Sequence, residues 1–170
     1  MSCLLFFYVT ACNNSGAYQT YIPTKEDSIR NERMIQRALI RIAVISKQIK
    51  SGDIITRRGS DFTSECLRQI NTRDKTWSHC GIASVEHDSV FVYHALGGDF
   101  NPDETIRRDH IKTFADPANN RGIGIYREQL DQPQTRELLS ITQKLFENKT
   151  RFDMDFDLRT DERMYCAEFV

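Results

Sequence analysis

The sequence predicts an α+β fold, in which one antiparallel sheet has helices packed against it. Its 170 residues suffice for a single domain with one buried core. Helical periodicity occurs before and after a central region, and that region holds short apolar segments in quick succession. Helix, then strands, then helix is the order typical of an α+β protein, whereas regular alternation of strand and helix would indicate a parallel sheet.

The composition excludes several classes of protein. Lys and Arg number 23 and Asp and Glu number 24, so the net charge of -1 gives no global basic field for binding nucleic acid. A hydrophobic fraction of 39%, with 8 Gly and 4 Pro, is typical of a globular protein and not of collagen-like, low-complexity or multi-span membrane chains. The 5 Cys residues contain no Cys-x-x-Cys pair, which argues against a zinc ribbon or a thioredoxin-type centre. We therefore expect no metal and no cofactor.

Residues 1–24 are interpreted as an export signal followed by a tether. The apolar stretch over 3–11 is too short to cross a bilayer as a mature helix, but it has the length of a signal-peptide core. It ends in Val9-Thr10-Ala11-Cys12, which resembles a bacterial lipobox, so we expect Cys12 to carry lipid and to anchor the protein in the cell envelope. The alternative is a buried N-terminal strand, because the first two residues supply no basic charge.

Three elements are expected before the centre of the chain. Apolar residues spaced by three and four predict an amphipathic helix over 25–50, whose arginines lie on or near the solvent side. Gly52-Asp53 ends this helix. A strand over 53–57 and a short helix over 63–70 are expected to follow.

A hairpin is expected at the centre of the chain. Two strand-like segments, 80–85 and 90–95, are separated by polar residues 86–89, which predict the turn. A third strand is expected over 122–127. These strands supply the predicted antiparallel sheet.

A second amphipathic helix is expected to begin at Pro133, a residue favoured in the first helical turn. An acidic loop follows over 153–162. Its alternating aspartates suggest calcium ligands, but a glycine at the sixth position and a glutamate at the twelfth are missing, so calcium is not expected. The aspartates are Asp153, Asp155 and Asp157.

The residues that could carry chemistry are cysteines and histidines. Cysteine catalysis needs a thiolate, a base and a group that orients the base. His79 and His94 fall on neighbouring strands of the hairpin, where side chains on one face can hydrogen-bond. Cys166 follows the acidic loop at the start of a helical segment, whose N–H groups lower a thiol pKa and can bind an oxyanion. Cys80 must point away from its neighbour His79 and is expected in the core, and Cys66 is expected to be an apolar filler.

Four segments of the chain resemble, in order and spacing, the circularly permuted papain-like amidases of the NlpC superfamily, in the YaeF/YiiX-like branch. The histidine strands precede the cysteine here, as they do in the permuted branch, and the resemblance covers about 50–170. The segments are Gly52-Asp53-Ile54-Ile55, Ser78-His79-Cys80-Gly81-Ile82, Val92-Tyr93-His94-Ala95, and Phe152-Asp153 leading to Tyr165-Cys166-Ala167-Glu168.

The resemblance assigns roles to individual residues. It implies that Cys166 is the nucleophile, His79 the general base and His94 the polar third member that orients the base. Tyr165 is expected to form a wall of the site, and Glu168 either to pair with a base or to cap the helix. The implied fold is a permuted papain-like domain over 25–170.

The resemblance also implies an activity. It indicates a cysteine hydrolase, a peptidase or amidase that cleaves an amide bond in cell-wall peptide. Together with the lipobox-like segment, this predicts an exported, lipid-anchored enzyme. Two alternatives stay open: a lipid thioesterase or acyltransferase with the same triad, and a non-catalytic envelope module that binds a peptide in the same groove. An apolar access channel would favour lipid, and a polar open groove would favour peptide.

The sequence after the expected nucleophile is short. Four residues follow Cys166, and Phe169 and Val170 look like the beginning of an apolar helical stripe. We therefore expect a C-terminally truncated copy of a longer protein, or a degenerate family member, in which the last helix is incomplete.

Overall fold

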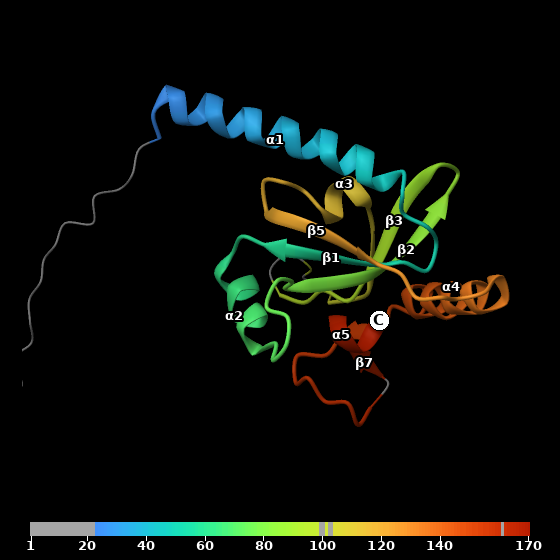
Figure 1. Ribbon diagram of the computed structural model, residues 1–170. Helices are drawn as coiled ribbons and strands as arrows, with labels where there is room; N and C mark the ends of the chain where they lie inside the picture. Colours follow the sequence, from blue (N-terminus) through green and yellow to red (C-terminus); the bar gives the residue numbers. More distant parts are fainter. Residues whose placement is uncertain (1–22, 99–100, 102–103, 161) are drawn as a thin grey trace, which may run out of the picture.

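The computed structural model describes residues 23–98, 101, 104–160 and 162–170 (Figure 1). The expected signal segment and its lipid-carrying Cys12 lie outside this part of the chain. In chain order the described elements are α1 (Lys25–Ser46), β1 (Ile54–Gly59), α2 (Phe62–Ile70), β2 (His79–Glu86), β3 (Ser89–His94), β4 (Arg107–His110), α3 (Ile111–Phe114), β5 (Asn120–Tyr126), α4 (Gln132–Glu147), β6 (Arg151–Phe152), β7 (Arg163–Met164) and α5 (Cys166–Phe169).

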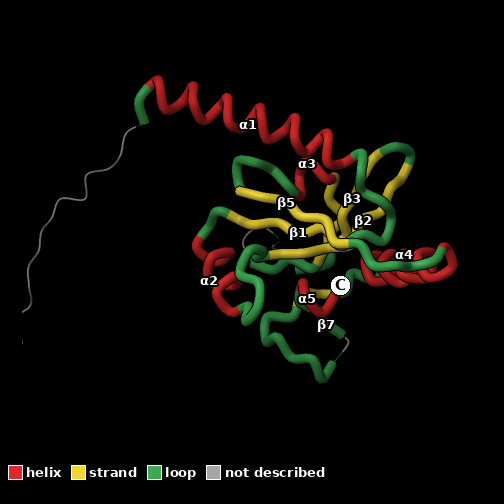
Figure 2. Tube along the Cα trace, viewed as in Figure 1, coloured by secondary structure: helices red, strands yellow, loops and turns green. Residues whose placement is uncertain are grey.

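An antiparallel sheet of five strands, in the order β4-β3-β2-β1-β5, forms the centre of the molecule (Figure 2). β6 and β7 pair in parallel as a separate small sheet. The expected hairpin is β2–β3, and its turn is tighter than expected: His87 and Asp88 have φ angles of 45° and 65°, as a two-residue turn requires. The mixed α+β class with an antiparallel sheet is confirmed.

Helices cover both faces of the sheet (Figure 1). On one face, Ile42 of α1 and Phe114 of α3 pack with strand residues such as Val92. On the opposite face, Phe169 of α5 packs with Tyr93 of β3, and leucines of α4 lie against them. The sheet therefore separates α3 from α5, and this separation determines how the candidate site is built.

The first helix, α1, is only partly attached to the rest of the molecule. A capping box starts it: Thr24 Oγ1 accepts a hydrogen bond from the N–H of Asp27, whose carboxylate accepts one from the N–H of Thr24. Its C-terminal half lies over α3 and the sheet, and its N-terminal half projects beyond them (Figure 1). Ile42 is buried, whereas Met34 and Ile40 are exposed. None of the described helices has the length and apolar character needed to cross a membrane.

The segment between α1 and β1 is the structural turn that the sequence predicts. Gly52 has a φ of 90°, which favours glycine. Asp53 is 2% exposed, accepts a hydrogen bond from the Lys50 N–H at 2.7 Å and pairs with the Arg127 guanidinium at 2.6 Å. This buried carboxylate ties the start of β1 to the segment that follows β5.

Several features differ from the sequence prediction. β4 and the short helix α3 are absent from it, because β4 has the charged sequence Arg-Arg-Asp-His and lacks the apolar alternation typical of a strand. Its charges are paired instead: Arg108 with Glu86, and Arg107 with Asp109. Cys66, expected as an apolar filler, is exposed on α2, so that expectation is wrong.

Candidate active site

Two histidines and an aspartate form a hydrogen-bonded chain across three neighbouring strands. His79 Nε2 lies 2.9 Å from His94 Nδ1, and His94 Nε2 lies 3.1 Å from Asp109 Oδ2. Arg107 donates to both oxygens of the Asp109 carboxylate, at 3.2 and 2.9 Å. The predicted contact between His79 and His94 is therefore present, and the chain continues to an acid that the sequence analysis did not identify.

Strand register places these side chains on one face of the sheet. Ala83 is paired with Val92, and Val92 is paired with Asp109. His79 is four residues from Ala83, and His94 is two residues from Val92, so all point to the same face. Asp109 could have been identified only from the pairing of β3 with β4, because nothing in its local sequence indicates a strand.

Gly81 provides the space that this arrangement needs. A Cβ atom at Gly81 would lie 2.5 Å from the carbonyl oxygen of Tyr93 and 2.8 Å from the Cβ of His94. Both distances are shorter than a normal contact, so any larger residue would push β3 and His94 away from β2. The glycine of the Ser-His-Cys-Gly-Ile segment thus has a packing role.

The surroundings set the protonation states along the chain. Burial lowers the pKa of His79 well below its usual value, and the nearby His94 and Arg57 charges act in the same direction. Burial also lowers the pKa of His94, although its hydrogen bond to Asp109 opposes the shift. Burial alone would raise the pKa of Asp109, but hydrogen bonds from His94 and Arg107 lower it to about 2. At neutral pH, His79 and His94 are therefore neutral imidazoles and Asp109 is a carboxylate.

Phe114 holds the two imidazoles in place. It is completely buried, and its ring centroid lies 5.8 Å from that of His79 and 5.0 Å from that of His94. Arg57 donates to the Phe114 carbonyl oxygen at 2.7 Å, and its guanidinium lies 4.8 Å from the Phe114 ring centroid. This apolar wall fixes the ring of His94, which is itself 0% exposed.

The candidate nucleophile Cys166 begins α5 and contacts Cys80 of β2. Cys80 Sγ donates a hydrogen bond to the carbonyl oxygen of Cys166 at 3.2 Å. The side chain of Cys80 is the main cause that lowers the pKa of Cys166 to about 7; burial opposes this, and the N–H groups of Ala167 and Cys80 support it. The same contact and burial raise the pKa of Cys80 above its usual value. Cys166 is thus the more easily ionised thiol of the two.

The thiol and the histidine chain approach β2 from opposite faces. Cys80 and His79 are adjacent in the strand and point to opposite faces, as the sequence predicts, but Cys166 lies on the side of Cys80. No hydrogen bond joins Cys166 Sγ to either imidazole among the described residues. Cys80, which was expected to be a core residue, is half-buried and contacts Cys166.

Two further atoms around the site are without hydrogen-bond partners. The Nδ1 atom of His79 makes no hydrogen bond to any described residue, while Nε2 is held by His94. Thr56, the cross-strand partner of Cys80, has a buried hydroxyl without a partner in the described part of the chain. His79 Nδ1 is therefore left for a reacting group, whereas the Thr56 hydroxyl is an unsatisfied polar atom inside the fold.

The two auxiliary residues of the prediction have structural positions. Glu168 accepts a hydrogen bond from the Tyr165 N–H at 3.3 Å, so it caps α5 and does not pair with a base. The ring of Tyr165 packs against Phe156 of the acidic loop, with centroids 5.3 Å apart. Tyr165 therefore lies beside the candidate nucleophile, where a wall of the site was expected.

The acidic loop is held by its own aspartate. Asp153 is 3% exposed and accepts hydrogen bonds from the N–H groups of Asp155 at 2.9 Å and of Asp157 at 2.5 Å. Such bonds stabilise a loop without a cation. Within the described ranges, no group of three or more His, Cys, Asp or Glu side chains is arranged to hold a metal ion.

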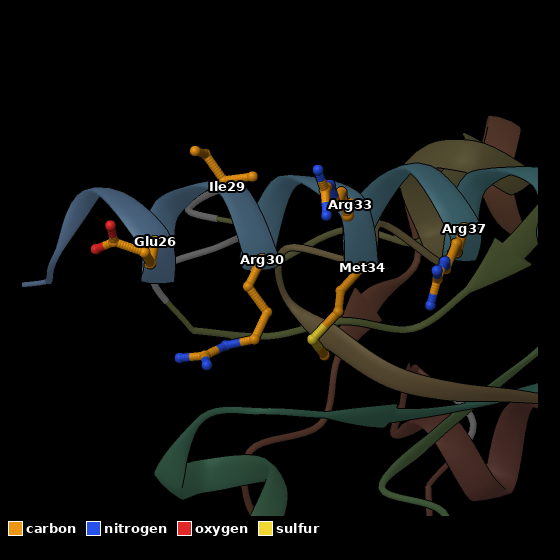
Figure 3. Close-up of a pocket in the computed structure, with 6 residues that line it drawn as sticks. All are labelled: Glu26, Ile29, Arg30, Arg33, Met34 and Arg37. Carbon is orange, nitrogen blue, oxygen red and sulfur yellow. The ribbon is translucent and has the colours of Figure 1, made fainter.

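A surface hollow lies away from this chemistry. It follows one side of α1 and is lined by residues of that helix alone, shown in Figure 3: Glu26, Ile29, Arg30, Arg33, Met34 and Arg37. It contains no nucleophile and no histidine, and α1 and α5 lie on opposite sides of the sheet (Figure 1). The hydrogen-bonded chain and the paired thiols, and not this hollow, are the candidate active site.

Fold and site together define an α+β protein in which a five-stranded antiparallel sheet carries a His–His–Asp chain and a cysteine pair. No protein-family model and no curated protein matches the chain. Among solved structures, it is similar to the metalloprotein yiiX from Escherichia coli O157:H7 (DUF1105), with a TM-score of 0.57 and 21% sequence identity, over 72% of this chain and 62% of that one. The chain thus spans less than two thirds of the length of that protein, and the likeness shows a shared fold.

Proposed function

We propose that this protein is a cysteine hydrolase with a permuted papain-like fold, in which Cys166 attacks the carbonyl carbon of an amide. His79 Nδ1 takes the thiol proton and returns it to the leaving amine, so that a thioester on Cys166 replaces the amide bond. Water then attacks the thioester, with His79 accepting its proton, and the acid is released while the thiol is restored.

The other residues of the hydrogen-bonded His–His–Asp chain hold and orient the base, His79. Asp109 accepts from His94 Nε2–H, so His94 Nδ1 accepts from His79 Nε2–H, and this fixes the tautomer in which His79 Nδ1 is unprotonated. Asp109 holds the other nitrogen of His94, and Arg107 holds Asp109. Because burial lowers its pKa, His79 is neutral at pH 7, and its Nδ1 lone pair is unprotonated.

One observation carries the proposal. A thiol whose pKa is lowered to about 7 contacts Cys80, and the residue before Cys80 begins a hydrogen-bonded His–His–Asp chain. Perturbed titratable groups that cluster in one region of a fold are typical of catalytic sites. The fold likeness to yiiX supports the same assignment at the level of architecture.

The proposed substrate is an amide of a cell-wall peptide. A lipid thioester or ester would undergo the same acyl transfer at Cys166, so thioesterase or acyltransferase activity uses the same residues. The substrates differ in the leaving group, because an amine or an alcohol needs a proton from His79 to depart at neutral pH, whereas the thiolate of a thioester does not.

A second candidate function is a non-catalytic envelope module that binds peptide. The observation that favours it is the absence of a hydrogen bond between Cys166 Sγ and either imidazole in the described structure. In a hydrolase, Cys166 Sγ has to reach His79 Nδ1 around the end of β2, where His79 is the first residue, when substrate is bound. In a binding module this contact never forms, and the thiol forms no adduct.

Mass spectrometry of the intact protein distinguishes these functions. We expect an acyl adduct on Cys166 after incubation with peptidoglycan fragments, or with acyl esters if the substrate is lipid. The adduct should be absent from Cys166→Ala and present in Cys66→Ser, whose thiol is exposed on α2. Reversible binding of the peptide without any adduct on Cys166 would identify the protein as a binding module and contradict the hydrolase.

We also propose that the protein is anchored in the cell envelope by lipid on Cys12. When the chain is expressed in bacteria, we expect it to partition into detergent and to incorporate labelled palmitate. Cys12→Ser should abolish both, whereas the matched variant Cys3→Ser, which changes a cysteine inside the expected signal core, should keep the label. Detection of soluble protein that retains Met1 would contradict the anchor.

A further inference from the structure

Two cysteines that are 86 positions apart in the sequence meet at the proposed nucleophile. Cys80 of β2 donates a hydrogen bond from its sulfur to the Cys166 carbonyl oxygen at 3.2 Å. Both side chains are half-buried on the same face of the sheet, where α5 packs against β2. Cys66, in contrast, is exposed on α2 and belongs to neither element.

The two thiols differ in a way that suits stepwise oxidation. Contact with Cys80 lowers the pKa of Cys166 to about 7, whereas the same contact raises the pKa of Cys80. Thiolates, and not thiols, react with peroxides, so oxidation begins at Cys166. The partner thiol beside it keeps its proton until a sulfenic acid has formed.

We propose that Cys80 and Cys166 form a dithiol site that a hydroperoxide oxidises to a reversible intramolecular disulfide. The inference rests on the proposed function in one respect: the disulfide would block the nucleophile of the hydrolase. Formation of the bond itself requires no hydrolytic activity.

Atoms and electrons balance in two steps. The Cys166 thiolate attacks one oxygen of the hydroperoxide, an S–O bond forms, the O–O bond breaks, and an alkoxide or hydroxide leaves. The sulfur of Cys80 then attacks Cys166 Sγ, the S–S bond forms, the S–O bond breaks, and the hydroxyl group leaves with the Cys80 proton as water. The peroxide is reduced by two electrons, which the two cysteines supply.

A buried hydroxyl lies beside the partner thiol Cys80. Thr56 is the cross-strand partner of Cys80, and its buried Oγ1 has no hydrogen-bond partner in the described residues. Side chains of directly paired residues lie close together on one face. The Thr56 hydroxyl therefore lies beside Cys80, the thiol that attacks the sulfenic acid.

Peptide mapping of the full-length protein tests the site directly. After treatment with a few equivalents of hydrogen peroxide and alkylation of the remaining thiols, trypsin should release a cross-linked pair of peptides. These are Thr76–Arg107, which contains Cys80, and Met164–Val170, which contains Cys166. We expect the pair to disappear on reduction with dithiothreitol, and Cys66 to be recovered alkylated in its own peptide.

Matched variants separate the partner thiol from a bystander. In Cys80→Ser, we expect peroxide to convert Cys166 to sulfinic acid, which dithiothreitol does not reverse. In Cys66→Ser, the disulfide should form as in the unaltered chain. Conversion of Cys166 to sulfinic acid in the unaltered chain, with Cys80 fully alkylatable, would overturn the proposal even if Cys80→Ser failed to fold.

The experiments distinguish failure of the dithiol site from failure of the proposed hydrolase function. We expect peroxide to form the disulfide and to abolish acyl-adduct formation, and dithiothreitol to reverse both changes. A disulfide in a protein that never forms an acyl adduct would refute the proposed function and leave the dithiol site in place. Full activity of peroxide-treated protein, with no disulfide peptide, would refute the dithiol site and leave the hydrolase in place.

Discussion

Replacing His79 by alanine is expected to slow acylation of Cys166 by an amide roughly 10²–10⁴-fold, the range typical of a lost general base. His79 is the only member of the His–His–Asp chain with a ring nitrogen left for the thiol proton among the described residues. The rate should be measured by quenched-time mass spectrometry of the adduct. His87→Ala, in the β2–β3 turn, is the matched control and should keep the full rate.

Replacing the other two members of the His–His–Asp chain should have smaller effects. His94→Ala and Asp109→Asn should lower the rate less than His79→Ala does, because they act on orientation and not on the proton itself. In the unaltered chain, alkylation of Cys166 by iodoacetamide should increase as pH rises through about 7, because its thiol ionises there. If His94→Ala is more damaging than His79→Ala, the roles of the two histidines are reversed.

Replacing Phe114 by alanine is expected to lower the free energy of unfolding by about 3–5 kcal/mol, the usual loss for a large aromatic core residue. Phe114 is 0% exposed and contacts both imidazoles and Arg57. The loss should be measured by urea denaturation. Phe62→Ala is the matched control: Phe62 is 83% exposed on α2, so its replacement should change stability by less than about 0.5 kcal/mol.

The same experiment tests the function of the apolar wall. If Phe114→Ala lowers stability by no more than Phe62→Ala does, the two histidines are not held by packing. Retention of a stable fold in Phe114→Leu, with slower acylation, would indicate that the aromatic ring positions the imidazoles and does more than fill volume.

Local patterns predicted the elements that carry strong apolar periodicity. The β2–β3 hairpin and α4 follow from alternation, a polar turn and a proline in the first helical turn. β4 could not be predicted in this way, because its four polar residues are stabilised by ion pairs and by pairing with β3. Tertiary contacts, and not its own sequence, make that segment a strand.

Some residues of the candidate site could likewise be placed from local patterns, and others could not. Alternation along β2 and β3 was enough to place His79 and His94 on one face, and to place Cys80 on the other. It could not place Cys166, because the face on which α5 docks depends on the packing of Phe169 against Tyr93 and Ile82. Asp109 was missed for the reason that β4 was missed.

The hydrogen bond between the two imidazoles depends on the close approach of β2 to β3, which Gly81 permits. With Cβ only 2.8 Å from His94, an added methyl group would separate the two rings without altering any polar group. Natural variation that preserves the proton path must therefore preserve a residue that has no side chain. Substitution at Gly81 is therefore restricted by the lack of space for a side chain, just as substitution at His79 is restricted by its functional group.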